Sequence, residues 1–460
     1  MSETIAVILA AGDGKRMMSK QPKVLCEVLF KPMLSWVLSA CEASGVGEIC
    51  VVAGYEHEQV EHYLNGAYPV VLQTERRGTG HAVMMAADFL KAHAGSNLLI
   101  LCGDAPFMDA ETLRGALAQH EGQGNSVTVI TANLENPEGY GRIVRKGSGI
   151  SGIVEQKDAT DDQLRITEIN SGAYWFKTDD LLSVLWNLKN DNAQGEFYLT
   201  DTISALLAAG KRAGAYCAAN ACVALGANDR KALLALNRLA TERIIDKHLE
   251  NGVGFVSTDG VMIGPDVTIE PGTVILPNTI LKGRTAVGAN CEIGPGCLLE
   301  NARVGDETRL NYVQAYDCVI HSQVKMGPFV HIRPNSEIHS GVKIGDFVEV
   351  KNSVVGSHTA IAHLTYVGDS DVGSHVNFGC GVVTVNYDGV NKMRTTIGDH
   401  AFIGCNTNLV APVKIGNTAY TGAGSTITKD VPDGALAVER ADQVMIKDYA
   451  YRKLRNKKER

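Results

Sequence analysis

The chain has 460 residues, of which 45% are apolar and 20% charged, so it is long enough for two or three domains and can bury a large core. Its 43 Lys and Arg against 51 Asp and Glu give a formal net charge of −8, which argues against a nucleic-acid-binding protein. No apolar run approaches the roughly 20 residues that a membrane span needs. The N-terminus lacks the features of a secretion signal and the 11 cysteines include no CxxC pair, so we expect reduced thiols and a cytoplasmic location.

Residues 1–228 alternate short apolar runs with helix-like stretches. The predicted strands lie at 5–9, 49–52 and 98–101, and the predicted helices lie at 33–43 and 81–93. Because strands that alternate with helices are typical of a parallel sheet covered on both faces, we expect a Rossmann-like α/β domain. Residues 229–250 then carry leucine and isoleucine at helical spacing and end before Asn251-Gly252, which predicts a linker helix.

The sequence pattern changes in the last part of the chain, residues 251–460. From about residue 261 an aliphatic residue followed by a small or polar one recurs every six positions, as in Val287-Gly288 and Ile344-Gly345. This period predicts a triangular parallel β-coil with three short sides and about 18 residues per turn. Cys291 and Cys297 fall on equivalent positions of the repeat, so their spacing does not indicate a metal site.

Two segments depart from the repeat. Val385–Lys392 breaks the six-residue register, and insertions in solenoids form loops, often on the binding face. The repeat ends after Asp433, and residues 452–460 contain six Lys or Arg in nine positions. We expect this basic segment to be a solvated, frayed tail, with a phosphate-facing role as the alternative.

In the first half, polar motifs follow the predicted strands. The glycines of Leu9–Met17 allow backbone N–H groups to approach an anion, and Arg16 and Lys23 add positive charge, which favours a phosphate site over an ordinary turn. Asp104 follows the third strand, where a carboxylate either holds Mg²⁺ beside phosphates or only caps the strand end. Gln73 with Gly78–His81 is either a second approach to the ligand or a plain loop.

In the second half, His363 stands where the repeat normally carries small residues. A lone histidine is often structural, but cationic residues recur near it at the spacing of one turn. Arg333 and Lys351 are 18 apart, so we expect them to stack as a cationic pocket for a phosphate. Glu349 is 14 residues before His363, and we expect its carboxylate to orient the imidazole from the coil below. On an 18-residue turn Glu349 would also align with Val367.

These motifs carry a family resemblance. Leu9–Met17 with Lys23 is similar to the signature of sugar-phosphate nucleotidyltransferases. The further matching motifs are Gly78–His81, Gly103-Asp104, Gly139–Arg142, Val154–Asp158, Glu168–Asn170, Gly195–Asp201 and Asn228. With the six-residue repeat behind them, the chain resembles over nearly its full length the bacterial bifunctional family that joins N-acetylglucosamine-1-phosphate uridylyltransferase to glucosamine-1-phosphate N-acetyltransferase. The resemblance implies that the coil is a left-handed parallel β-helix of hexapeptide repeats.

For the first domain the resemblance implies three sets of contacts. The nucleotide, UTP, would contact Leu9, Ala10, Ala11, Gly12, Lys23, Gln73, Gly78, Thr79 and Gly103. The sugar phosphate would contact Gly141, Glu155 and Asn170, and Mg²⁺ would bind Asp104 and Asn228. We choose Arg16 as the catalytic phosphate clamp, because guanidinium binds phosphate bidentately. Lys15 and Cys102 stand where the family commonly has Thr and Tyr, which leaves the contacts beside the nucleotide open.

For the second domain the resemblance assigns His363 as the general base that takes a proton from the glucosamine amine as it attacks the thioester of acetyl-CoA. The implied sugar-phosphate contacts are Arg333, Lys351, Tyr366 and Asn377. The implied acetyl-CoA contacts are Cys380, Asn386, Tyr387, Cys405, Ala423 and Arg440. Cys380 and Cys405 replace the Ala and Ser that the family usually has, so an acyl-cysteine at Cys405 is conceivable, although direct transfer needs none.

The expected protein is therefore a two-activity enzyme that makes UDP-N-acetylglucosamine, an envelope precursor, from glucosamine-1-phosphate. Its partners would be small molecules, with Mg²⁺ as cofactor, and the resemblance implies a homotrimer with acetyl-CoA between subunits. The alternative is a single-activity sugar-phosphate nucleotidyltransferase whose β-helix is only structural. A third interpretation, a nonenzymatic nucleotide-sugar-binding protein, leaves Asp104, Asn228 and Arg16 without a role.

Overall fold

The computed structural model describes residues 3–147 and 149–458. The chain forms two compact units that divide between Glu242 and Arg243, and each is described by itself. Among the described residues, no helix has the length and apolarity needed to cross a membrane.

The first unit is built on a mixed sheet with the order β11-β7-β10-β6-β1-β4-β5. Its strands are β1 (Thr4–Ala10), β4 (Glu48–Ala53), β5 (Val70–Leu72), β6 (Asn97–Cys102), β7 (Val127–Asn133), β10 (Glu168–Lys177) and β11 (Ala213–Cys217). β1, β4 and β6 confirm the three predicted strands and run parallel to one another.

The prediction of a fully parallel sheet is wrong at β10, which runs antiparallel to both β6 and β7. Between β7 and β10 the chain forms a hairpin, β8 (Arg142–Lys146) and β9 (Gly149–Val154), and the short helix α6 (Asp161–Leu164). Because no long crossover helix intervenes, the chain returns beside β7 in the opposite direction, as an antiparallel pair allows.

Helices cover both faces of this sheet, as expected. One core packs against α1 (Met33–Ser44), α2 (His57–Leu64) and α5 (Ala110–Gly122). The other core packs against α3 (Thr79–Met85), α4 (Ala87–Ala92), α7 (Thr178–Leu185) and α8 (Asp201–Ala208). The helix predicted over 81–93 is therefore two helices, because Ala86 leaves the helical conformation at φ −87° and ψ 10°.

The predicted linker helix is α9 (Arg230–Glu250), and the division between the two units falls inside it. The Asp229 carboxylate accepts a hydrogen bond from the Ala232 N–H at 2.8 Å and so caps the start of the helix. Beyond its end, Gly252 has φ +82°, a left-handed conformation that suits a glycine after a helix C-terminus.

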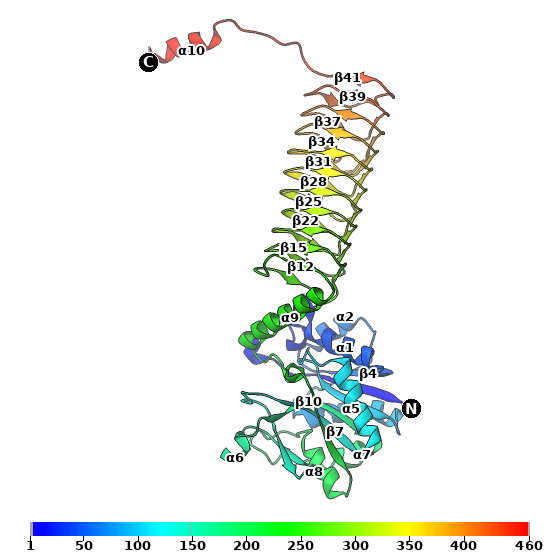
Figure 1. Cartoon of the computed structure of the whole chain (residues 1–460), viewed down its shortest axis with the longest axis vertical. Helices are drawn as coiled ribbons and strands as arrows, with labels where there is room; N and C mark the ends of the chain where they lie inside the picture. Colours follow the sequence, from blue (N-terminus) through cyan, green and yellow to red (C-terminus); the bar gives the residue numbers. More distant parts are fainter. Residues whose placement is uncertain (1–2, 148, 459–460) are drawn as a thin grey trace. The chain divides into compact units, whose positions relative to one another are not determined.

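The second unit is the predicted parallel β-helix, whose coils stack one on another from β12 (Gly254–Phe255) to β41 (Leu436–Ala437) in Figure 1. Among the described residues it has three sheets, of 11, 10 and 9 short strands. We call the 10-stranded sheet the Lys351 sheet, after a residue of its strand β28. Its strands are β13 (Met262–Ile263), β16 (Ile280–Lys282), β19 (Leu298–Glu300), β22 (Val313–Tyr316), β25 (Val330–Ile332), β28 (Val348–Lys351), β31 (Tyr366–Gly368), β34 (Val383–Val385), β37 (Asn408–Val410) and β40 (Thr426–Ile427).

The inward side chains of the coils explain the six-residue period. Ile332, Val350 and Val367 are almost fully buried in one continuous aliphatic core. The turn length, however, is not a constant 18 residues. Lys351 pairs with Gly368, 17 positions on, and Glu349 pairs with Tyr366 rather than with Val367. The side that follows β28 is one residue shorter, because the buried residues Val350 and Val355 of successive sides are only five apart.

The predicted insertion forms a loop between β34 and β35 (Thr395–Ile397), pinned by an antiparallel bridge between Tyr387 and Lys392. The prediction of a frayed basic tail is wrong in its local structure, because α10 (Tyr449–Lys458) is helical. Its described side chains up to Arg455 are nevertheless exposed.

Candidate functional site

A cavity of about 620 Å³ opens in the first unit beyond the carboxyl ends of β1 and β6. Predicted residues that line it are Leu9, Ala11, Gly12, Lys23, Gln73, Gly78, Thr79, Cys102 and Asp104. The parallel strands β1, β5 and β6 and the segments that follow them therefore bring these residues to one edge of the sheet, where open α/β sheets bind ligands.

The two expected metal ligands meet at one point of this cavity. The Lys23 ammonium donates to the Asp104 carboxylate and, at 3.0 Å, to the Asn228 side-chain oxygen. A positive charge, that of Lys23, therefore lies between a carboxylate and an amide oxygen that come from distant parts of the chain. These are the donors that Mg²⁺ prefers, so the residues fit the ion.

The opposite wall is formed by Gln73 and the start of α3. The buried Gln73 amide donates to the Gly78 carbonyl at 3.0 Å, and the Leu199 N–H donates to the Thr79 hydroxyl at 3.1 Å. Gly78 has φ +102°, and a Cβ there would lie 2.6 Å from the Phe197 carbonyl oxygen, so only glycine fits. The segment is thus a fixed part of the cavity wall.

The three residues expected to contact the sugar phosphate lie together: Gly141 directly before β8, Glu155 directly after β9, and Asn170 in β10. The Asn170 N–H donates to the Gly141 carbonyl at 2.9 Å. A Cβ at Gly141 would approach a Glu155 carboxylate oxygen to 3.3 Å. Burial first, and then the neighbouring carboxylates of Asp158 and Asp201, raise the pKa of Glu155.

Two arginines of the first unit differ in whether they line the cavity. Arg16 is exposed in the turn Lys15–Met17. Arg76, which sequence reasoning missed, lines the cavity and pairs with Asp13 at 2.6 Å. The available signal was its place between Gln73 and Gly78.

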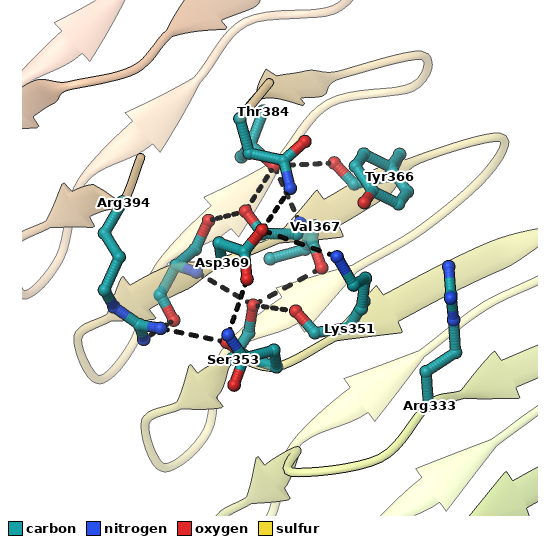
Figure 2. A network of polar contacts seen from close by, with 12 residues as sticks. Arg333, Lys351, Ser353, Tyr366, Val367, Asp369, Thr384 and Arg394 are labelled. Carbon is teal, nitrogen blue, oxygen red and sulfur yellow. Dashed lines mark hydrogen bonds and ion pairs between the residues drawn. The ribbon is translucent and has the colours of Figure 1, made fainter. Parts of the chain in front are cut away.

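A second group of polar residues lies on the Lys351 sheet of the β-helix. Figure 2 shows Arg333 and Lys351 side by side on neighbouring coils, with Tyr366 on the next strand. The backbone N–H of Arg333 donates to the backbone carbonyl of Val350 at 2.8 Å, which aligns Arg333 with Lys351. The expected stacking of the two cations is therefore present. Arg333 also binds the Glu349 carboxylate at 2.9 Å.

Asp369, which the sequence did not single out, connects Lys351 to the insertion loop (Figure 2). Its carboxylate lies 3.6 Å from the Lys351 ammonium and accepts hydrogen bonds from the Asn352 and Asn386 amides. Burial alone would raise the pKa of Asp369, but these two amides and Lys351 outweigh it and hold the pKa below its usual range. Asp369 therefore stays ionised and fixes Asn386.

His363 lies at the corner before β31, in the left-handed conformation at φ +58°. Its Nδ1 is 2.7 Å from the Asp346 carboxylate, and its side chain is 61% exposed. The expectation that Glu349 orients this imidazole is wrong, because Glu349 pairs with Arg333 and Asp346 occupies the corner one coil below. The backbone fixes that juxtaposition, since the Leu364 N–H donates to the Asp346 carbonyl at 3.1 Å.

Several residues expected to contact acetyl-CoA stack above His363 at the same corner. Backbone hydrogen bonds connect the coils at this corner. The Gly381 N–H donates to the His363 carbonyl at 3.0 Å, the Asn406 N–H to the Cys380 carbonyl at 2.7 Å, and the Gly424 N–H to the Cys405 carbonyl at 2.8 Å. Arg440 reaches the Ala423 carbonyl at 3.4 Å. The corner is thus one continuous column through His363, Cys380, Cys405 and Ala423.

Asn377, Asn386 and Tyr387 lie apart from this column. Asn377 is exposed on β33 (Asn377–Phe378), which belongs to the neighbouring 11-stranded sheet. Asn386 and the exposed Tyr387 follow β34, whereas Cys380 precedes it. The expected acetyl-CoA contacts therefore occupy both ends of the strands of the Lys351 sheet.

Comparisons with known proteins agree with this division. The Nucleotidyl transferase family matches residues 5–227, and the Bacterial transferase hexapeptide (six repeats) family matches residues 266–301, 317–352 and 394–429. The first unit is therefore of the nucleotidyltransferase class, and the second is a hexapeptide-repeat β-helix of the bacterial transferase class.

Full-length relatives combine both classes. The chain is 45% identical over 458 residues to the bifunctional protein GlmU of Acetivibrio thermocellus, covering 99% of each chain. It is 46% identical to that of Caldanaerobacter subterraneus subsp. tengcongensis, covering 96% of each, and 44% identical to that of Halalkalibacterium halodurans, covering 98% of this chain and 100% of the relative. The chain belongs to the family of bifunctional GlmU proteins, which confirms the resemblance seen in its motifs.

Proposed function

We propose that the chain acetylates glucosamine-1-phosphate with acetyl-CoA in its β-helix and then transfers UMP from UTP to the resulting N-acetylglucosamine-1-phosphate in its first unit. The observation that carries this proposal is the presence of two separate polar sites, one in each unit, each with the residue types its reaction needs. A structural β-helix would have no use for His363 paired with Asp346 beside Arg333 and Lys351.

In the first site, the sugar-phosphate oxygen attacks the α-phosphorus of UTP and pyrophosphate leaves. Lys23 and Arg76 line the cavity and offset the triphosphate charge, while Gln73 and the wall at Gly78 and Thr79 position the nucleotide. Arg16 reaches the phosphates only if its exposed turn closes over the cavity, so Arg76 is the second candidate for the clamp. Asp104 and Asn228 would hold Mg²⁺, which neutralises phosphate charge when bound.

In the second site, Arg333 and Lys351 bind the phosphate of glucosamine-1-phosphate, and Tyr366 and Asn377 contact the sugar. Asp346 holds Nδ1 of His363, so Nε2 accepts the proton of the substrate amine as that amine attacks the thioester carbonyl. Asp346 then stabilises the imidazolium that forms. The proton balance is complete when CoA leaves as the thiol and His363 returns to its neutral form.

Acetyl-CoA is proposed to bind along the column above His363, with Cys380, Cys405, Ala423 and Arg440, and to contact Asn386 and Tyr387. Since these residues lie at both ends of the strands, a contact from a neighbouring subunit of a homotrimer would complete the site. We further propose a cytoplasmic location, where UTP and acetyl-CoA are available.

The test is to incubate the purified chain with glucosamine-1-phosphate, acetyl-CoA, UTP and Mg²⁺, and to follow free CoA and pyrophosphate separately. Both products are expected, with CoA release preceding pyrophosphate release. Pyrophosphate without CoA, when N-acetylglucosamine-1-phosphate is also supplied, would support the single-activity alternative with a structural β-helix. Nucleotide binding without either product would support a binding protein.

A further inference from the structure

The 9-stranded sheet of the β-helix carries two histidines where neighbouring coils carry glycine. The position that follows its short strands is glycine in six coils, at Gly288, Gly305, Gly356, Gly373, Gly398 and Gly416. In two successive coils it is instead His321, after β23 (Val319–Ile320), and His339, after β26 (Glu337–Ile338). The His321 N–H donates to the Ile338 carbonyl at 2.8 Å, which places the two histidines in adjacent register.

Glu337 lies two residues before His339, with the fully buried Ile338 between them, so both side chains leave the same outer face of the sheet. The imidazole rings of His321 and His339 stack with centroids 4.9 Å apart. Nε2 of His321 is 2.9 Å and Nε2 of His339 is 3.6 Å from the same Glu337 oxygen. The three potential ligand atoms all lie within 4.8 Å of one another.

The two separations between a histidine and Glu337 are close to the edge length of a metal coordination polyhedron. In a tetrahedral site with metal–nitrogen bonds of about 2.0–2.1 Å, neighbouring ligand atoms are about 3.3–3.4 Å apart. The distances from the Glu337 oxygen to Nε2 of His321 and to Nε2 of His339, 2.9 Å and 3.6 Å, lie on either side of that value. The longer one is too long for a hydrogen bond, so a proton can link only His321 to the carboxylate, whereas a cation can link all three groups.

The cluster is also open to solvent. The side chains of His321, Glu337 and His339 are 40%, 44% and 38% exposed. A cavity of about 410 Å³ lies beside His321 and is bordered by Arg303, Gly305 and Ser322. A bound ion would therefore keep a position for water or another small ligand.

We propose that His321, Glu337 and His339 form a binding site for one divalent transition-metal ion of the Zn²⁺ type, which links two successive coils of the β-helix. Two imidazoles and one carboxylate suit Zn²⁺ and its neighbours in the first transition row, and disfavour Mg²⁺ and Ca²⁺, which take oxygen ligands. The site lies on a different sheet from His363 and Lys351, so the inference does not rest on the proposed function.

The test is calorimetric titration of the full-length apo-protein with Zn²⁺, and with Co²⁺ for its absorption spectrum. The background carries Cys217→Ser and Cys405→Ser, because these two thiols are exposed and bind soft metals. One Zn²⁺ per chain and a spectrum of tetrahedral or five-coordinate Co²⁺ are expected. His321→Ala and His339→Ala should each weaken binding by at least about tenfold, and Glu337→Gln should weaken it and alter the Co²⁺ spectrum.

His375→Ala is the matched control, since His375 is an exposed histidine that stacks between His358 and His400 outside the cluster. It should bind Zn²⁺ like the parent protein. Circular dichroism of each variant checks that the β-helix is folded. The proposal is overturned if the parent binds no Zn²⁺, if both cluster variants bind it as tightly as the parent, or if His375→Ala is the variant that loses the ion.

Discussion

The two sites of this chain are assembled in different ways. In the first unit, Lys23, Asp104 and Asn228 are far apart in sequence and meet because strands and loops of one sheet converge on a cavity. In the β-helix, Asp346 and His363 meet because they occupy the same corner of successive coils. The first site therefore depends on sheet topology, and the second depends on the number of residues in each turn.

The difference makes the two sites separable by mutation. The largest expected effect is that of Asp104→Ala, which removes the carboxylate that would hold Mg²⁺. Pyrophosphate release should fall below detection, while CoA release stays near that of the wild type. Asn228→Ala should cost less, because a neutral amide binds the cation more weakly than a carboxylate.

Asp109→Ala is the matched control for this change. That carboxylate also follows β6, but it caps α5 by accepting from the Thr112 N–H at 2.7 Å. The variant should lose some stability and keep both activities. A folded Asp104→Ala protein that has lost CoA release as well would break the separation of the sites.

The next largest effect is expected for His363→Ala. General-base catalysis contributes about 10²–10⁴ in rate, so the kcat of acetyl transfer should fall by that order. The KM for acetyl-CoA should change little, and uridylyl transfer from supplied N-acetylglucosamine-1-phosphate should be unaffected. If the variant retains near-wild-type acetyl transfer at neutral pH, the base is another group.

A smaller effect is expected for Asp346→Asn, which keeps the shape of the contact to His363 but removes its charge. Hydrogen bonds to charged groups contribute about 1.5–3 kcal/mol, so kcat for acetyl transfer should fall about 10- to 100-fold. Glu349→Gln is the informative comparison, because Glu349 faces Arg333. It should alter the KM for glucosamine-1-phosphate and leave kcat for acetyl transfer close to that of the wild type. The reverse pattern would return the orienting role to Glu349.

The smallest effect is expected for Cys405→Ser. If the thiol is only a contact in the coenzyme column, the hydroxyl should replace it with at most a few-fold loss of acetyl transfer. Mass spectrometry of the wild type during turnover provides the opposing observation. An acetylated Cys405 that forms and decays at the turnover rate would replace direct transfer with a covalent route.

Much of this architecture could be predicted from the sequence, and the errors have physical causes. Strand existence, the linker helix and the six-residue repeat follow from apolar periodicity, which reports burial directly. The direction of β10 does not follow from it, because the apolar pattern of a buried strand is the same in parallel and antiparallel pairing. The helix break at Ala86 carries no glycine or proline signal.

The errors at the sites have similar origins. A constant turn of 18 residues would align Glu349 with Val367 and His363 with Gly345. The side after β28 is one residue short, so Glu349 aligns with Tyr366 and Asp346 takes the position below His363. At the corner that follows β28 and β31 the chain has Asn352 and Asp369, both at positive φ. Asparagine and aspartate tolerate this backbone conformation, so their positions are the sequence signal that could have revealed the shorter turn. Arg76 was missed as a candidate phosphate clamp, because only the folded loop brings its side chain to the cavity.

The central claim is that the protein holds two independent sites, joined only by the diffusing product N-acetylglucosamine-1-phosphate. The most direct test mixes equal amounts of folded Asp104→Ala and His363→Ala proteins and supplies glucosamine-1-phosphate, acetyl-CoA, UTP and Mg²⁺. Neither variant alone should make UDP-N-acetylglucosamine at an appreciable rate, and the mixture should make it. A mixture that remains inactive, although each variant keeps its own half-reaction, would contradict independent sites that exchange a free intermediate.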